Sequence, residues 1–63
     1  MSKLLRLVSV KDVTGLSRSS IYAFIEQGKF PKQIKIGERA VAWDELEIQE
    51  WIDSCKQSSQ TVQ

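Results

Sequence analysis

The side chains of this 63-residue chain that could do chemistry are hydroxyls and a guanidinium, gathered in one short segment. The group consists of Ser17, Arg18, Ser19, Ser20 and Tyr22, and the small Ala23 lies next to them in the sequence. The chain has no histidine, which is the commonest general base and metal ligand, and its single cysteine cannot form an internal disulfide. The sequence therefore predicts no enzyme, no metal site and no cofactor, and these groups become candidates for binding.

The chemistry that suits these groups is recognition of double-stranded DNA. A guanidinium can pair with the edge of guanine through two hydrogen bonds, which is the contact expected of Arg18. Ser19 suits a base edge or a phosphate, and the small Ala23 leaves room for a thymine methyl. Tyr22 has two open interpretations, a hydroxyl donated to phosphate or a ring packed in the core. The alternative for the whole segment is a solvated helix face with one arginine.

A second basic group lies in the segment that follows Pro31. Lys35, Gly37 and Arg39 are expected at the tip of a β-hairpin, where a basic side chain can lie on the DNA backbone or enter a minor groove. Arg39 has the alternative of pairing with Glu38 or with a later acidic helix. This hairpin is the expected wing of the protein.

A helix and a tight turn are predicted before the first group. Ser9 is the expected N-cap, with Asp12 three residues on, and Val10 and Val13 supply an apolar face. Gly15 permits the positive φ that a tight turn between two helices needs. The first helix should therefore end at Thr14.

A second helix should carry the first group. Ser17 is its expected N-cap, and the helix should run over residues 18–27. Its apolar face is formed by Ile21, Phe24 and Ile25, and Gly28 is expected to end it in a left-handed conformation. This spacing is typical of a helix-turn-helix whose second helix enters the major groove.

A hairpin and a third helix complete the predicted fold. Apolar residues alternate with other residues at Ile34, Ile36, Val41 and Trp43, as in a two-stranded hairpin. Asp44 should cap a third helix, with Glu47 completing a capping box. Its apolar stripe is Ile48, Trp51, Ile52 and Cys55, and both tryptophans are predicted core residues.

The predicted fold is mainly α with a small β-hairpin, a winged helix-turn-helix in the order α-α-β-β-α. Residues 1–55 form a single domain, and residues 56–63, rich in Gln, Ser and Thr, are predicted to be a disordered tail. No apolar run approaches the ~20 residues of a membrane span, so the expected location is the cytoplasm, with no membrane partner.

Charge is segregated along the chain. Residues 1–43 carry eight basic and three acidic side chains, a net charge of +5, whereas residues 44–63 carry one basic and five acidic side chains, a net charge of −4. One face could therefore meet DNA while another faces away, the alternative being an ordinary uneven surface. Lys11, Lys29 and Lys32 are candidates for general phosphate attraction, although solvated lysines explain them nearly as well.

Three pieces of sequence together resemble the AlpA family of prophage and mobile-element regulators, which is similar in fold to excisionases and to the DNA-binding heads of MerR-type proteins. The pieces are TGLSRSSIY, GKFPKQIKIG and RAVAWDELEIQEWI, in this order. The resemblance implies recognition-helix roles for Arg18, Ser19 and Tyr22 and wing roles for Lys35 and Arg39. Many relatives carry a further basic residue where this chain has Ala23.

The resemblance implies a sequence-specific DNA-binding protein that regulates transcription of integrase genes or acts as a recombination directionality factor (excisionase). The sequence leaves these two roles open. Expected partners are double-stranded DNA, an integrase, and further copies of the chain on DNA. The alternative is a protein-interaction adaptor or antitoxin-type module built on the same small core. A basic face favours DNA, whereas an exposed apolar groove would favour a protein partner.

Overall fold

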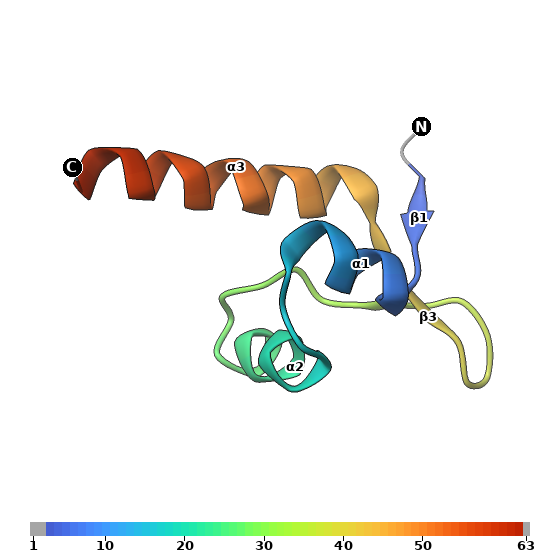
Figure 1. Ribbon diagram of the computed structural model, residues 1–63. Helices are drawn as coiled ribbons and strands as arrows, with labels where there is room; N and C mark the ends of the chain where they lie inside the picture. Colours follow the sequence, from blue (N-terminus) through green and yellow to red (C-terminus); the bar gives the residue numbers. More distant parts are fainter. Residues whose placement is uncertain (1–2, 63) are drawn as a thin grey trace.

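Three helices and three short strands are formed by residues 3–62, which are the residues that the computed structural model describes (Figure 1). Side chains are described for residues 3–58. The elements are β1 (Leu4–Leu5), α1 (Leu7–Thr14), α2 (Arg18–Glu26), β2 (Ile34–Lys35), β3 (Val41–Asp44) and α3 (Glu45–Val62). The predicted order α-α-β-β-α is confirmed, and β1 is added in front of it.

The turn between α1 and α2 depends on Gly15. Its φ of 73° lies in the left-handed region, as predicted, and its backbone N–H donates to the carbonyl of Lys11 at 2.8 Å. The Thr14 hydroxyl donates to the carbonyl of Val10 at 2.7 Å and accepts from the backbone N–H of Leu16 at 3.3 Å. The turn is thus closed by local hydrogen bonds, and α2 leaves it in a fixed direction.

The start of α1 differs from the prediction. The helix begins at Leu7 with Arg6 as its N-cap, so the prediction of Ser9 as N-cap was wrong. No side chain caps this end of the helix. Leu7 packs against the core. Burial of this residue directly after β1 outweighs the approximately 1 kcal/mol that a serine cap would contribute.

Both ends of α2 follow the sequence prediction. The Ser17 side chain accepts from the backbone N–H of Ser20 at 3.2 Å, which satisfies one of the unpaired donors at the start of the helix. At the other end Gly28 has a φ of 74°. The Gly28 N–H donates to Ile25 and the Lys29 N–H donates to Phe24, the paired bonds of a Schellman motif.

The strands form an antiparallel sheet in the order β1-β3-β2. The predicted hairpin is confirmed, with Ile34 opposite Ala42 and Lys35 opposite Val41. β1 was not predicted, because two residues are too few to show an alternating pattern. It pairs Leu5 with Trp43, which makes β3 the central strand.

The core lies where α1, α2 and α3 meet β3. Its buried residues are Val10, Ile21, Phe30, Trp43 and Ile48. Trp43 is fully buried, and its indole N–H donates to the carbonyl of Pro31 at 3.0 Å, so its one polar atom is satisfied. Trp51 is half-buried against this core, as predicted, and its indole N–H donates to the carbonyl of Lys29 at 2.7 Å.

Helix α3 is longer than predicted and projects beyond the other elements (Figure 1). Asp44 caps it, but its carboxylate accepts from the N–H of Leu46 at 3.0 Å instead of that of Glu47. The helix continues past residue 56 to Val62, a segment for which a disordered tail was expected. Adding residues to an existing helix avoids the cost of nucleation. Cys55 is exposed, which corrects its interpretation as an apolar contact.

Candidate nucleic-acid interface

The outer face of α2 presents part of the predicted recognition group to solvent. Arg18, Ser19 and Ala23 are exposed, while Ile21 on the inner face is fully buried. The other two serines of the group also form the N-terminal cap of the helix, and their contact with DNA stays a prediction. The Ser17 hydroxyl donates to that of Ser20 at 3.1 Å while capping the helix, so both belong to the cap that sets the start of α2.

Tyr22 connects this outer face to the core. Its ring meets the ring of Trp43 edge to face, with centroids 6.3 Å apart and an interplanar angle of 66°. On the other side the Arg18 guanidinium carbon lies 5.4 Å from the centre of the same ring, within cation–π range. Tyr22 is half-buried, so core packing is one of its roles, and contact of its hydroxyl with phosphate stays a prediction.

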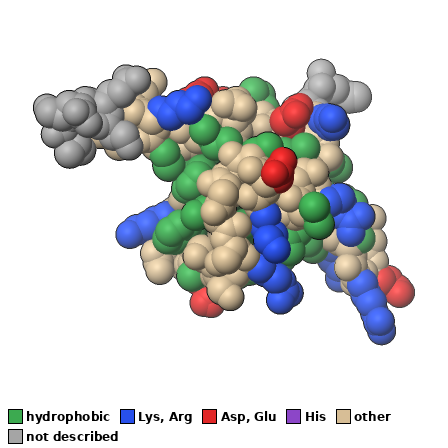
Figure 2. All heavy atoms as spheres, viewed as in Figure 1, with side chains coloured by type: hydrophobic (Ala, Val, Ile, Leu, Met, Phe, Trp, Pro, Cys, Tyr) green, Lys and Arg blue, Asp and Glu red, His purple; other side chains and the backbone are tan. Residues whose placement is uncertain are grey.

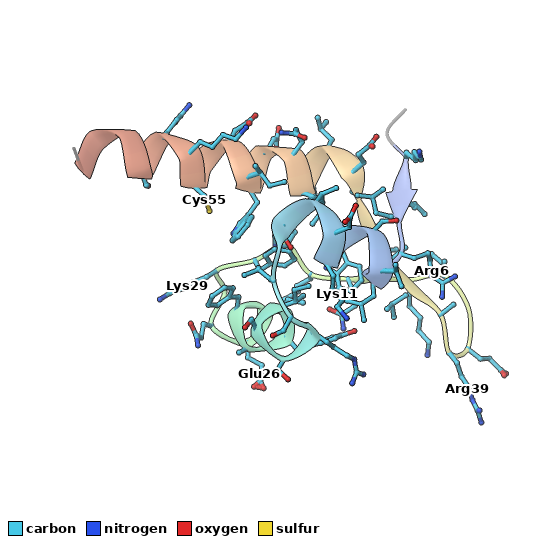
Figure 3. All side chains as sticks on the ribbon, viewed as in Figure 1. Arg6, Lys11, Glu26, Lys29, Arg39 and Cys55 are labelled. Atoms are coloured by element: carbon cyan, nitrogen blue, oxygen red, sulfur yellow. The ribbon has the colours of Figure 1, made fainter. Side chains whose placement is uncertain are left out.

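The hairpin presents its predicted residues at an exposed tip. Lys35, Gly37 and Arg39 are all exposed, and the Ile36 N–H donates to the Ala40 carbonyl at 2.9 Å to close the loop between them. Figure 3 shows Arg39 at the end of the hairpin, pointing away from the domain. Gly37 has no positive φ, and a Cβ there would meet Ala40 at 3.6 Å, an ordinary contact. The fold therefore does not require glycine at this position.

Arginines from three separate parts of the chain line one hollow, called here the arginine hollow. Its lining consists of Arg6, Leu7, Val8, Arg18, Tyr22, Arg39 and Val41, and its volume is about 370 Å³. It thus lies between the start of α2 and the hairpin. No carboxylate is part of this lining, among the residues that the structure describes.

Arg6 is the residue of this hollow that sequence reasoning missed. Its Nε–H donates to the carbonyl of Val41 on β3 at 3.1 Å, which attaches the start of α1 to the hairpin (Figure 3). The two residues are 35 positions apart in the sequence. A local sequence pattern cannot reveal a contact over this separation. The only sign of Arg6 in the sequence was a basic residue directly before α1.

Two of the predicted phosphate residues lie elsewhere. Lys29 and Lys32 line a second hollow, called here the α3 groove, together with Gly28, Phe30, Pro31, Gln33, Ile34, Glu47, Glu50, Trp51 and Ser54. Figure 3 shows Lys29 at the end of α2 far from the hairpin, pointing away from it. Lys11 is exposed on α1. The structure therefore brings Arg18 and Arg39 together but separates Lys29 and Lys32 from them.

The visible surface reflects this distribution of charge. In Figure 2 many of the Lys and Arg side chains gather at the lower right, over the start of α2 and the hairpin. Within residues 3–62, no three His, Cys, Asp or Glu side chains are grouped so as to hold a metal ion. None of the helices in the described part of the chain combines the length and apolar character needed to cross a membrane.

Two helices joined by a tight turn and followed by a hairpin, with arginines lining the hollow between them, define the class of fold. The family described as "Prophage CP4-57 regulatory protein (AlpA)" matches residues 3–56, and the chain belongs to this family. The predicted family is therefore confirmed.

Two relatives show the extent of the similarity. The chain is 36% identical over 61 residues to a protein of Escherichia coli named as the DNA-binding transcriptional activator AlpA, a match covering 86% of this chain and 87% of that protein. It is 42% identical over 50 residues to the uncharacterised protein ORF88 of enterobacteria phage P4. That match covers 79% of this chain and 57% of the phage protein, so the chain spans little more than half of that relative.

Proposed function

We propose that this chain binds duplex DNA sequence-specifically, with α2 in the major groove and the hairpin on the adjacent backbone or minor groove. The observation that carries the proposal is the arginine hollow. It joins the exposed face of α2 to the hairpin, and no carboxylate is part of its described lining. In helix-turn-helix proteins the second helix contacts base edges with its N-terminal residues, which is where Arg18 and Ser19 lie.

The proposed biological role is supported by the family and by the name of the E. coli relative, a DNA-binding transcriptional activator. The chain acts in the cytoplasm as a non-enzymatic regulator of transcription in a prophage or mobile element, with integrase genes as targets. A role as recombination directionality factor, with an integrase as protein partner, is the finer form of the same proposal. A footprint of the purified protein in a promoter supports the first role, and one in an attachment region supports the second.

The decisive test of DNA binding is its salt dependence. Each phosphate neutralised by a basic side chain releases counterions, so the logarithm of affinity should fall with the logarithm of salt concentration, with a slope of about −0.9 per phosphate. Fluorescence anisotropy of labelled duplexes at increasing salt measures this slope. A response that does not change with salt contradicts the proposal.

Assembly on DNA is part of the proposed function. A single small module buries roughly 600–1,000 Å² of its surface on DNA, which limits its affinity. The chain should therefore be a monomer in sedimentation experiments without DNA and bind adjacent sites cooperatively. Equal affinity per copy on single-site and two-site duplexes contradicts cooperative assembly.

The alternative function is a protein-interaction adaptor or antitoxin-type module. The observation that favours it is the α3 groove, whose lining includes the apolar residues Phe30, Pro31, Ile34 and Trp51. The same groove also carries lysines and glutamates, whereas charged residues are depleted at the centre of typical protein interfaces. Absence of duplex binding at low salt would favour this alternative.

A further inference from the structure

Arg6 has a charged neighbourhood that the sequence does not show. It lies just outside α1, is exposed, and lines the arginine hollow together with Arg18 and Arg39. The described lining contains no acidic side chain, so three arginines border one hollow that has no carboxylate among its described residues. Such an arrangement is favourable when an anion occupies the hollow.

Two of the three guanidiniums are held in place before any anion arrives. The Nε–H of Arg6 is bonded to the carbonyl of Val41, which directs the rest of its guanidinium without neutralising it. Arg18 lies over the ring of Tyr22, which itself packs against Trp43. Side chains ordered in the unbound protein lose less conformational entropy on binding, so they contribute more to affinity.

The position of the hollow selects the anion. A single sugar-phosphate strand separates a major groove from the minor groove next to it, so this strand must pass between a helix in the first and a hairpin on the second. The arginine hollow lies between these two elements. In helix-turn-helix proteins the first helix crosses the backbone, and Arg6 is at the beginning of that helix.

We propose that Arg6 binds a phosphodiester of the DNA strand that passes through the arginine hollow, and that Arg39 contacts the same linkage or its neighbour. The proposal rests on the proposed function. It assigns a backbone contact to a residue outside both the recognition helix and the hairpin. Arg18 keeps its separate role at the base edge, at the border of the same hollow.

The first test removes the charge of Arg6. Arg6→Gln should weaken binding about tenfold on cognate and random duplexes alike, as expected for loss of a charge-assisted hydrogen bond to phosphate. The slope of log affinity against log salt should decrease in magnitude by about 1. Arg6→Lys, which keeps the charge but replaces the guanidinium, should retain most of the slope.

The matched control is Lys3→Gln, which removes the same charge from the same N-terminal segment at a residue that does not line the hollow. It should change affinity less than Arg6→Gln. Thermal melting of each variant identifies any loss of affinity caused by unfolding. Equal losses for the two variants overturn the proposal, because they indicate general electrostatic attraction.

The second test works on the DNA and does not depend on the stability of any variant. Replacing single phosphodiesters by neutral methylphosphonates across the site should reveal one linkage, or two adjacent ones, at which Arg6→Gln loses less affinity than the wild-type protein does. Arg39→Gln should likewise lose less affinity than the wild-type protein at the same linkage or at the adjacent one. If Arg6→Gln stays as sensitive as the wild-type protein at every linkage, the phosphate contact is overturned while DNA binding stands. If the wild-type protein binds no duplex, both the proposed function and this contact are contradicted.

Discussion

The arginine hollow and the α3 groove depend on the same tryptophan but differ in the charges that line them. Trp43 contacts the Tyr22 ring of the hollow, and its indole N–H bonds to the Pro31 carbonyl of the groove. The hollow is lined by three arginines without a carboxylate among its described residues. In the groove, Lys29 and Lys32 share the lining with Glu47 and Glu50.

This difference shows that the net charge of a segment does not predict which charges lie near each side chain in the fold. The first 43 residues carry a net charge of +5, and in the sequence Lys29 and Lys32 look as suitable for DNA as Arg39 does. Folding places these two lysines on the same lining as Glu47 and Glu50 of α3, whereas the described lining that the arginines share contains no carboxylate. Electrostatic potential depends on which charges lie within a few ångströms, since salt screens the others over about 10 Å.

The largest expected effect is a loss of stability on removal of Trp43, which contacts residues of both regions. Trp43→Ala should lower the free energy of unfolding by about 3–5 kcal/mol, because the side chain is fully buried and its loss leaves a cavity. For a domain this small that is a large part of its stability. Chemical denaturation followed by circular dichroism measures the change. Trp51→Ala, at a half-buried tryptophan, should cost less, and the reverse order contradicts the central position of Trp43.

The next effect concerns specificity at the border of the arginine hollow. Arg18→Ala should cost about 1–3 kcal/mol of binding free energy on the cognate duplex and much less on random DNA, if a two-hydrogen-bond contact to a base is lost. Competition binding with the two duplexes measures both values. The comparison with Arg6→Gln is informative, because that variant should lose affinity equally on both. Equal losses for Arg18→Ala would mean that Arg18 contacts only the backbone.

A smaller effect on stability should distinguish Gly15, in the turn between the helices, from Gly37, in the hairpin. Gly15→Ala should lower the free energy of unfolding by roughly 1 kcal/mol, because its φ of 73° is unfavourable for a residue with a Cβ. Gly37→Ala should leave stability almost unchanged, since its Cβ makes only an ordinary contact. If Gly37→Ala nevertheless weakens DNA binding, close approach of the hairpin to DNA is supported. Equal stability losses for the two variants contradict this assignment.

Local chemistry explains which parts of the fold could be predicted. The Ser17 cap, the left-handed Gly15 and the capping Asp44 each involve residues within four positions, so their patterns are visible in the sequence. The exposed face of α2 followed from the apolar spacing around Ile21. These features were confirmed.

Contacts between distant segments explain what could not be predicted. The two-residue β1 exists because β3 pairs with it, and Arg6 joins the candidate site because it reaches Val41. The wrong N-cap at Ser9 has the same origin, since β1 and the burial of Leu7 fix where α1 begins. Each of these depends on a partner that only the folded chain supplies.

The smallest expected effect belongs to the α3 groove. Lys29→Gln and Lys32→Gln should each weaken binding to all duplexes by about 0.5 kcal/mol or less, the range of exposed charge interactions, because nearby glutamates offset the field of these lysines. Anisotropy titrations at low salt, where long-range attraction is strongest, give the best chance of detecting the change. The controls are two double variants, in which Glu47→Gln is combined with Lys29→Gln or with Lys32→Gln. If the lysines act only through the net charge of the groove, removing the glutamate should restore most of the lost affinity. A loss as large as that of Arg6→Gln, confined to the cognate sequence, would place DNA on the α3 side and remove the distinction between the two regions.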